Sequence, residues 1–261
     1  MSDSSQVWFD DSKYTANTTQ TRHGGQLLSQ LKRVISKDDK SHLFAKRVID
    51  VGSNDGELTE IVNNTFQNAM NVAADESFKH VKKCPEQISP VCASFPKHPF
   101  RNQSFDIVFS NATVHWIMQQ EKLYKEFMNI TRNHGYIAIC TGAAQYNKEF
   151  VGLARELSKT EKYSSHFSDG FEYPLQYYTE NEYREFMQSI PNLKIREFHI
   201  EEKIGSAESY PRFIDGGILP FLKQLPTEKH SEFKTDFETE CRANLSDVTM
   251  NRIFTILKKK L

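Results

Sequence analysis

One stretch near the start of the chain, residues 46–58 (KRVIDVGSNDGEL), constrains the fold more than any other. Its apolar run Val-Ile-Asp-Val is rich in β-branched residues and is bounded by polar residues, which is typical of an interior parallel strand. Gly52 and Gly56 bracket Ser-Asn-Asp, residue types that tolerate tight and left-handed backbone. The stretch therefore predicts a buried strand that runs into a glycine-containing turn.

A helix is expected directly after this turn, beginning near Asp55 or Gly56. Apolar residues recur there at helical spacing, namely Leu58, Ile61, Val62 and Phe66. The missing side chains at Gly52 and Gly56 would let a ligand approach the backbone and the free N–H groups of the helix start. The turn alone is compatible with phosphate binding, with nucleoside binding or with a plain strand–helix connection. No Gly-Lys-Ser/Thr follows and G-x-G-x-x-G is not met, which excludes the common phosphate loops.

A second strand is expected over residues 71–77, and it contains an acid, Asp75. Asp75 lies 19 residues after Gly56, close to the spacing of about 20 at which a ribose-binding carboxylate occurs in βαβ nucleotide folds. A carboxylate there can accept hydrogen bonds from both ribose hydroxyls. The alternative is a solvated acid at the end of a strand.

Further strands and helices continue this alternation. The expected strands are 90–95, 105–112 and 136–140, with a helix over 122–131 and a turn at 133–135. Because strands alternate with helices, we predict an α/β fold with a doubly wound, mostly parallel sheet. Ligands bind past the carboxyl ends of the strands in such sheets. Four segments fall at those ends: Asp50–Gly56, Asp75, Ser94–Phe95 and Asn111–Trp116.

The alternation stops after the fifth strand. Residues 142–178 are rich in aromatic and polar groups and are expected to form an insertion over the rim, a candidate acceptor cap. Thr179-x-x-Glu182 predicts a capping box that opens a helix ending before Pro191. Beyond it we expect a strand over 193–204, helical pieces over 207–240 and a last strand over 252–257. At the other end, a helix is expected over 26–35, preceded by an aromatic-containing arm, which either docks on the body or is a flexible tail.

Composition excludes several classes of protein. The 261 residues carry 33 basic and 34 acidic side chains, a balance that argues against a large nucleic-acid surface. No apolar run approaches the ~20 residues of a membrane span, and no secretory signal is seen. The four cysteines and nine histidines show no metal-ligand spacing. Cys92 and Cys140 lie in apolar strand-like runs and are expected to be buried thiols. We therefore expect a cytoplasmic protein that binds neither metal, nucleic acid nor membrane.

With these residues in place, the chain resembles the class I S-adenosylmethionine-dependent methyltransferases. The family motif Asp/Glu-x-Gly-x-Gly-x-Gly is similar to Asp50–Gly56, with Asn54 at the middle glycine, and the ribose acid with x-Ser matches Asp75–Ser77. The Leu-Pro-Phe…Ser-Phe-Asp segment matches residues 98–106. The usual Gly-Asp-Ala at the adenine corresponds to residues 93–95, with Ser94 in place of the carboxylate. The resemblance implies a seven-stranded Rossmann-like sheet and S-adenosylmethionine as the cofactor.

The resemblance also assigns roles to residues of this chain. It implies that one methyltransferase domain spans 1–261, with an N-terminal arm over 1–22 and cap insertions over 142–178 and 206–240. Tyr14 would lie near the transferred methyl group and Arg22 near the methionine carboxylate. The complete set of expected cofactor-binding residues is Tyr14, Arg22, Asp50, Gly52, Ser53, Asn54, Gly56, Asp75, Glu76, Ser94, Phe95, Asn111 and Ala112.

Within that class the chain looks most like the carboxylate O-methyltransferases that act on trans-aconitate, juvenile hormone acid or malonyl carrier protein. Their Asn-Ala-x-x-Gln/His-Trp is similar to Asn111–Trp116, which makes His115 and Trp116 the candidate catalytic residues that hold an acceptor. The alternative for both is core packing. The implied function is methylation of the carboxylate oxygen of a small organic acid. Methylation of a nitrogen, carbon or hydroxyl, and a non-catalytic cofactor-binding protein, stay open, as does the oligomeric state.

Overall fold

The computed structural model describes residues 18–38, 45–168, 170–206 and 217–260. Its contacts divide these residues into two compact units. The larger unit comprises the described residues of 15–144, 176–201 and 252–261. The smaller unit comprises those of 145–175 and 202–251. Each unit is described by itself.

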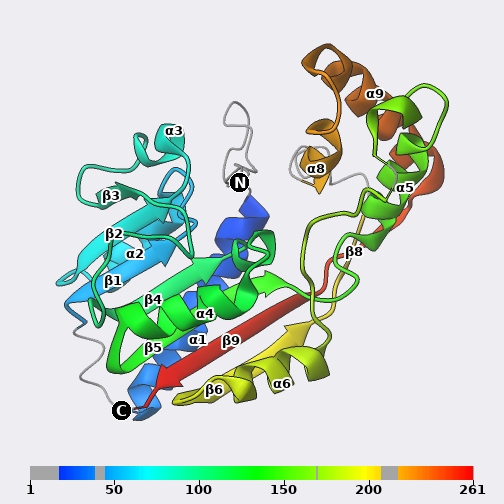
Figure 1. The fold of residues 1–261 in the computed structure, drawn as a ribbon. Coiled ribbons are helices and arrows are strands. Elements are labelled where there is room, and N and C mark those ends of the chain that lie inside the picture. Colours follow the sequence, from blue (N-terminus) through cyan, green and yellow to red (C-terminus); the bar gives the residue numbers. More distant parts are fainter. Residues whose placement is uncertain (1–17, 39–44, 169, 207–216, 261) are drawn as a thin grey trace. The chain divides into compact units, whose positions relative to one another are not determined.

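The larger unit is built on a seven-stranded sheet with the order β3-β2-β1-β4-β5-β9-β6 (Figure 1). Its strands are β1 (Arg47–Val51), β2 (Met70–Asp75), β3 (Ser89–Cys92), β4 (Phe105–Asn111), β5 (Thr131–Gly142), β6 (Leu193–Glu201) and β9 (Arg252–Lys259). The strands from β3 to β5 pair in parallel, whereas β9 pairs antiparallel with both β5 and β6. The predicted doubly wound, mostly parallel sheet is confirmed.

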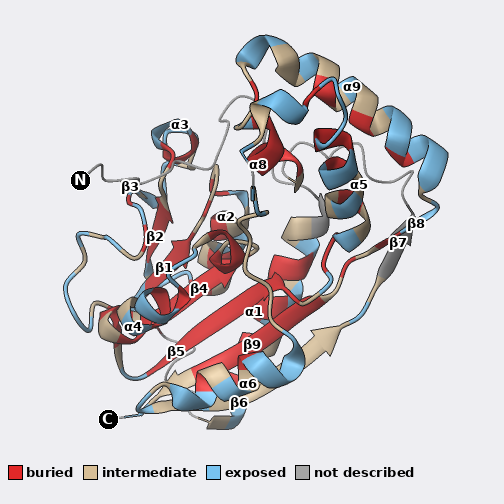
Figure 2. Cartoon of the chain, turned by 45° about the vertical axis from the view of Figure 1, so that its right-hand side comes forward, coloured by how far each residue is buried: buried red, intermediate tan, exposed pale blue. Residues whose placement is uncertain are grey.

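Helices cover both faces of this sheet because successive strand residues point in opposite directions. They are α1 (Thr18–Asp38), α2 (Glu57–Thr65), α3 (Phe78–Val81), α4 (Gln120–Ile130) and α6 (Glu180–Ser189). On β1, Val48 packs in one apolar cluster with residues of α1 and α2, and its neighbour Ile49 packs in the other with residues of α4 and α6. The central strands are accordingly buried (Figure 2).

Several element boundaries differ from the sequence-based expectation. Helix α1 begins at Thr18, so residues 18–22 of the expected arm are helical, and residues 1–17 lie outside the described part of the chain. The turn expected at 133–135 is a bulge within β5. Thr131 pairs with Phe105 and Tyr136 pairs with Ile107, so β5 gains extra residues between them. The bulge includes His134, whose φ is 65°.

The strand expected over 193–204 is in fact two strands that belong to different sheets. β6 ends at Glu201 in the large sheet, and β7 (Ile204–Ser206) pairs with β8 (Asp247–Thr249) in the smaller unit. The N–H of Met250 donates to the carbonyl of Lys203 at 2.7 Å and continues that pairing. A continuous run of weakly alternating residues does not show where a chain changes sheets, because each half satisfies the same pattern.

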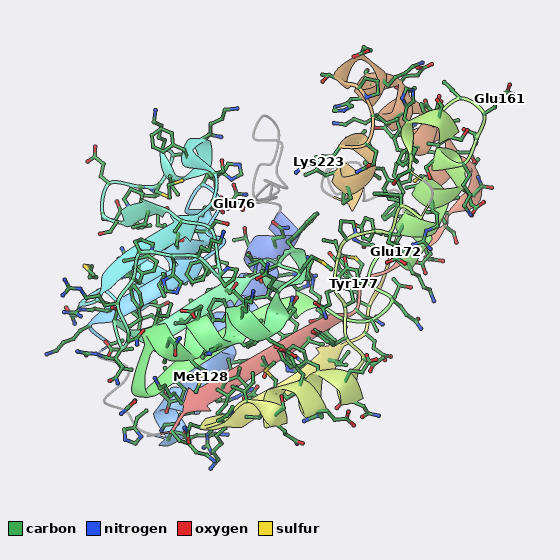
Figure 3. The ribbon with its side chains drawn as sticks, in the orientation of Figure 1. Glu76, Met128, Glu161, Glu172, Tyr177 and Lys223 are labelled. Atoms are coloured by element: carbon green, nitrogen blue, oxygen red, sulfur yellow. The ribbon has the colours of Figure 1, made fainter. Side chains whose placement is uncertain are left out.

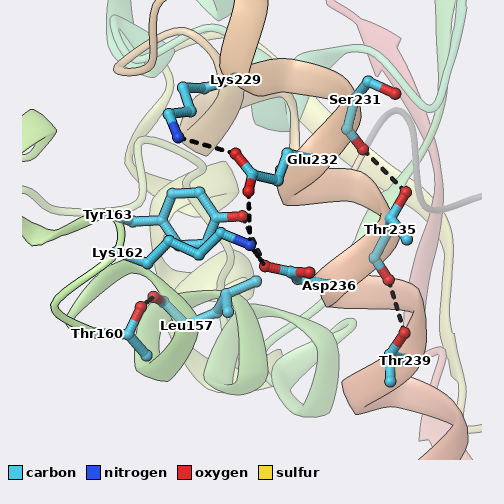
Figure 4. A network of polar contacts seen from close by, with 10 residues as sticks. All are labelled: Leu157, Thr160, Lys162, Tyr163, Lys229, Ser231, Glu232, Thr235, Asp236 and Thr239. Atoms are coloured by element: carbon cyan, nitrogen blue, oxygen red, sulfur yellow. Dashed lines mark hydrogen bonds and ion pairs between the residues drawn. The ribbon is translucent and has the colours of Figure 1, made fainter.

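The smaller unit consists mainly of helices around an aromatic core. Its elements are α5 (Lys148–Ser158), a 3₁₀ turn η3 (Ser164–His166), α8 (Leu219–Leu222), α9 (Thr227–Asn244), β7 and β8. The ring of Tyr163 packs edge-on against Phe233 at 4.9 Å, and its hydroxyl donates to Asp236 at 2.7 Å (Figure 4). Lys162 joins the same carboxylate to Glu232. Of the helices that the structure describes, none is both long and apolar enough to cross a membrane.

Candidate active site

The turn after β1 adopts left-handed backbone at three positions. Gly52, Asn54 and Gly56 have φ values of 77°, 53° and 84°. Helix α2 begins at Glu57 with Gly56 as its N-cap residue, within one or two residues of the predicted start at Asp55 or Gly56. The N–H groups of Gly52 and Ser53 donate to the carbonyl of Ala74 at 2.8 and 3.1 Å, which ties the turn to β2. Asn54 therefore adopts the conformation that a glycine would favour, one that asparagine tolerates better than most residues.

Both glycines of the turn face parts of the protein itself. A Cβ atom at Gly52 would lie 2.0 Å from Oγ1 of Thr113, and one at Gly56 would lie 2.9 Å from Sγ of Cys84. Close packing and positive φ together account for glycine at these two positions. The expectation that a ligand approaches the backbone at these two glycines stays a prediction beside this requirement of the fold.

Asp75 lies at the end of β2 and connects this strand to the turn. Its Oδ2 accepts the N–H of Asn54 at 3.0 Å, and its Oδ1 accepts the N–H of Ser77 at 2.9 Å. Nδ1 of His80 lies 3.4 Å from the same Oδ1. The side chain of Asp75 keeps 11% of its surface exposed, so it can still reach a ligand.

Asp50, the acidic residue of β1, is only 2% exposed. Its Oδ2 accepts the hydroxyl of Thr59 on α2 at 2.7 Å. Burial raises the pKa of Asp50 to about 7, the Thr59 hydrogen bond opposes that shift, and the charge of Asp75 adds to it. Asp50 therefore lies beside a second carboxylate in a poorly solvated place.

The surroundings of the turn favour a cationic ligand with hydrogen-bond donors. Burial and, to a smaller extent, the negative charges of Asp55, Asp50 and Asp75 together raise the pKa of the Cys84 thiol to about 11, so all three acids act on this thiol. Among the described residues, five side-chain oxygens are buried without a hydrogen-bond partner. Those of Asn54, Asp55 and Asn111 lie at or near this edge, and the other two belong to Gln30 and Asn71. Buried acceptors of this kind are normally paired. A sulfonium cofactor with an ammonium group and ribose hydroxyls fits these groups.

The ends of β3 and β4 contribute the remaining candidates. Ser94 is exposed, and its hydroxyl donates at 3.3 Å to the carboxylate of Glu76. Figure 3 labels Glu76. Phe95 is buried at 8% exposure. The amide of Asn111 donates to the carbonyl of Gln20 at 3.1 Å, which brings the start of α1 to the end of β4. Ala112, with φ of 55°, donates its N–H to Cys140 of β5.

His115 and Trp116 lie in a 3₁₀ turn, η2 (Val114–Trp116), directly after β4, and both are buried. Nδ1 of His115 is 2.9 Å from the hydroxyl of Thr141 on β5. Burial and, to a smaller extent, the positive charge of Arg252 together lower the pKa of His115 to about 3. The imidazole is therefore neutral. Its ring centre lies 5.8 Å from Trp116 and 5.6 Å from Tyr177, which Figure 3 labels.

The structure thus brings the predicted residues of β1 to β4 to one edge of the sheet. Tyr14 lies outside the described residues, and Arg22 is exposed on α1. The sequence did not predict several residues that contact or act on the predicted site residues, because a sequence pattern does not link positions on different elements. These residues are Thr59, His80, Thr113, Thr141 and Arg252.

Possible metal ligands and the four cysteines are further candidates for parts of the site. The described residues contain no group of three or more His, Cys, Asp or Glu side chains that could hold a metal ion. All four cysteines are free thiols. Cys140 is buried as expected, but Cys92 is exposed, because β3 is the edge strand of the sheet and lacks a second neighbour.

Comparisons with known proteins point to methyltransferases. Residues 49–139 match the methyltransferase domain family. A malonyl-[acyl-carrier protein] O-methyltransferase of Marinomonas sp. (strain MWYL1) is 27% identical over 116 residues, 41% of this chain. The match spans 43% of that relative, less than half of its length.

Two solved structures have a similar fold. The YcgJ protein of Bacillus subtilis has a TM-score of 0.59 at 13% identity, over 92% of this chain and 99% of that one. A phosphoethanolamine N-methyltransferase 2 of Haemonchus contortus, in complex with S-adenosylhomocysteine, has a TM-score of 0.51 at 15% identity, over 91% of this chain and 53% of that one. At such identities the likeness concerns the fold alone.

Proposed function

We propose that this chain, whose residues 49–139 match the methyltransferase domain family, transfers the methyl group of S-adenosylmethionine to the carboxylate oxygen of a small organic acid. Asp75 would bind the ribose, the turn around Asn54 would hold the methionine end, and the edge near Ser94 and Phe95 would hold the adenine. His115 and Trp116 would face the acceptor. The buried, unpartnered oxygens of Asn54, Asp55 and Asn111 support this arrangement.

The neutral state of His115 is the observation that carries the choice of acceptor. A neutral hydroxyl needs a base to remove its proton, and an imidazole with a pKa of about 3 is a poor base at neutral pH. A carboxylic acid with an ordinary pKa near 4 is already ionised. The acceptor that suits this site best is therefore one that arrives as an anion.

A buried positive charge also supports a carboxylate as the acceptor. Arg252 is 1% exposed, and among the described lysines and arginines it alone is buried. It pairs with Gly142 where β5 ends, at the edge of the sheet that carries His115. A poorly solvated cation beside the acceptor position would favour a carboxylate over a neutral group. The relative from Marinomonas is also described as an O-methyltransferase.

The reaction is balanced without a proton transfer. When bound, the cofactor supplies an electrophilic methyl group on a positively charged sulfur. A lone pair of the acceptor carboxylate forms the new C–O bond while the C–S bond breaks, and the electron pair of that bond stays on sulfur. The products are a methyl ester and S-adenosylhomocysteine. The protein contributes orientation and exclusion of water, which together can supply ~7–11 kcal/mol.

Methyl-labelled S-adenosylmethionine and pools of small carboxylic acids test this proposal. We expect label in a product that alkali converts to volatile methanol, because esters hydrolyse whereas N- and C-methyl groups do not. Calorimetry with S-adenosylmethionine, run in parallel, reports binding. Alkali-stable label would replace the carboxylate with another acceptor. Binding without transfer to any pool would favour a non-catalytic role.

A further inference from the structure

The carboxylate of Asp75 is held by three neighbours, and one of them is a side chain. Two are backbone N–H groups, those of Asn54 and Ser77, one on each oxygen. The third is Nδ1 of His80, which lies 3.4 Å from Oδ1. Backbone groups are present whatever the sequence, so His80 is the contact that this sequence adds.

The place of His80 follows from the short helix after β2. Ser77 caps α3, and its Oγ accepts the N–H of His80 at 3.3 Å. This one-turn helix carries His80 back beneath the strand end, where the residue is only 2% exposed. The imidazole that contacts Asp75 is therefore almost fully buried, whereas the Asp75 side chain keeps 11% of its surface exposed.

Asp75 needs such support because of its neighbours. Its charge and that of Asp50 act on each other, and like charges repel. A carboxylate has two oxygens with about four acceptor positions. Three of them face Asn54, Ser77 and His80, which leaves about one position on Oδ2 for a ligand, so the plane of the carboxylate decides where that position points. When Nδ1 of His80 carries the ring proton, the imidazole can donate to Oδ1 from 3.4 Å and so restricts how this plane turns.

We propose that His80 is a positioning residue for ribose recognition, one that orients Asp75 so that its remaining acceptor position on Oδ2 meets a ribose hydroxyl of the cofactor. The inference rests on the proposed role of Asp75 in cofactor binding. It extends that role to a residue that touches the acid and not the ligand, and it predicts that His80 governs how strongly the site distinguishes a ribose from a sugar without hydroxyls.

Binding of adenosine and of 2′,3′-dideoxyadenosine, each measured by competition against labelled S-adenosylhomocysteine, tests this. The ratio of the two dissociation constants reports ribose recognition alone. We expect His80→Phe, which fills the space without a donor, to reduce this ratio roughly tenfold. His80→Asn places an amide nitrogen where Nδ1 was, so it should keep most of the ratio. His80→Gln places the amide further out and should lose it.

Three comparisons make the result decisive. His199→Phe removes a histidine of β6 that stacks on Phe254, far along the sheet order from Asp75, and should leave the ratio unchanged. If His80→Phe does not fold, the contrast between His80→Asn and His80→Gln decides. A ratio equal to wild type in His80→Gln or His80→Phe overturns the inference. Failure of the wild-type protein to bind S-adenosylhomocysteine overturns the proposed function instead.

Discussion

At the scale of single residues, Asp50 makes the stability of the fold depend on pH. Its pKa is about 7 in the folded protein, against 3.8 for an unperturbed aspartate, because of burial and the charge of Asp75. Between about pH 4 and pH 7 the folded state therefore binds more protons than the unfolded state, and the free energy of unfolding falls as the pH rises. Above pH 7 both states are ionised and the effect is complete.

Asp50→Asn should remove this dependence, since asparagine does not titrate. As the pH rises from 4 to 8, the free energy of unfolding of the variant should increase relative to that of wild type by up to about 4 kcal/mol. Urea unfolding at several pH values in this range measures the difference. Parallel stability curves for the two proteins would show that Asp50 titrates normally.

A substitution at Trp116 can show whether this residue binds the acceptor or only packs in the core. It is 9% exposed and follows His115 at the edge of the sheet. Trp116→Phe keeps an aromatic ring but loses the indole N–H, which could donate to an acceptor carboxylate. We expect kcat/KM for the acid found in the labelling assay to fall roughly tenfold while the Kd for S-adenosylmethionine holds. A joint loss of stability and cofactor binding would assign Trp116 to packing.

At the scale of elements, the start of α6 depends on a predicted capping box. Thr179 accepts the N–H of Glu182 at 3.3 Å, and Glu182 accepts the N–H of Thr179 at 2.8 Å. Thr179→Ala should cost about 1 kcal/mol of stability, because it leaves an N–H of the first turn without its partner. Thr239→Ala, inside α9, is the matched control and should be close to neutral (Figure 4). Equal effects in urea unfolding would contradict a specific role for the cap.

At the scale of the whole molecule, the role of the N-terminal arm in catalysis stays a prediction. The start of α1 at Thr18 shows where the arm can be cut to test it. Removal of residues 1–17 leaves α1 intact, because this helix begins at Thr18. The resemblance places Tyr14 near the transferred methyl group, so the shortened protein should fold but lose turnover in the labelling assay. Circular dichroism checks the fold. Full activity after the deletion would show that the arm has no part in catalysis.

The sequence by itself determined the parts of the fold that are local. The β1–turn–α2 unit, the acid at the end of β2 and the capping box of α6 follow from residue spacing, turn chemistry and apolar periodicity, all of which act over a few neighbouring residues. Their arrangement at one edge also followed, because parallel strands all end on the same side of a sheet.

Only the tertiary structure decided what depends on residues far apart in the chain. The bulge in β5 and the end of β6 at Glu201 arise from pairing with other strands. The neutral imidazole of His115 results from its burial and from Arg252, 137 positions later. Gly52 is required by Thr113, and Asp50 meets Thr59 across the start of α2. A sequence pattern reports the preferences of neighbouring residues, whereas pKa values and close packing are set by whichever groups folding brings into contact.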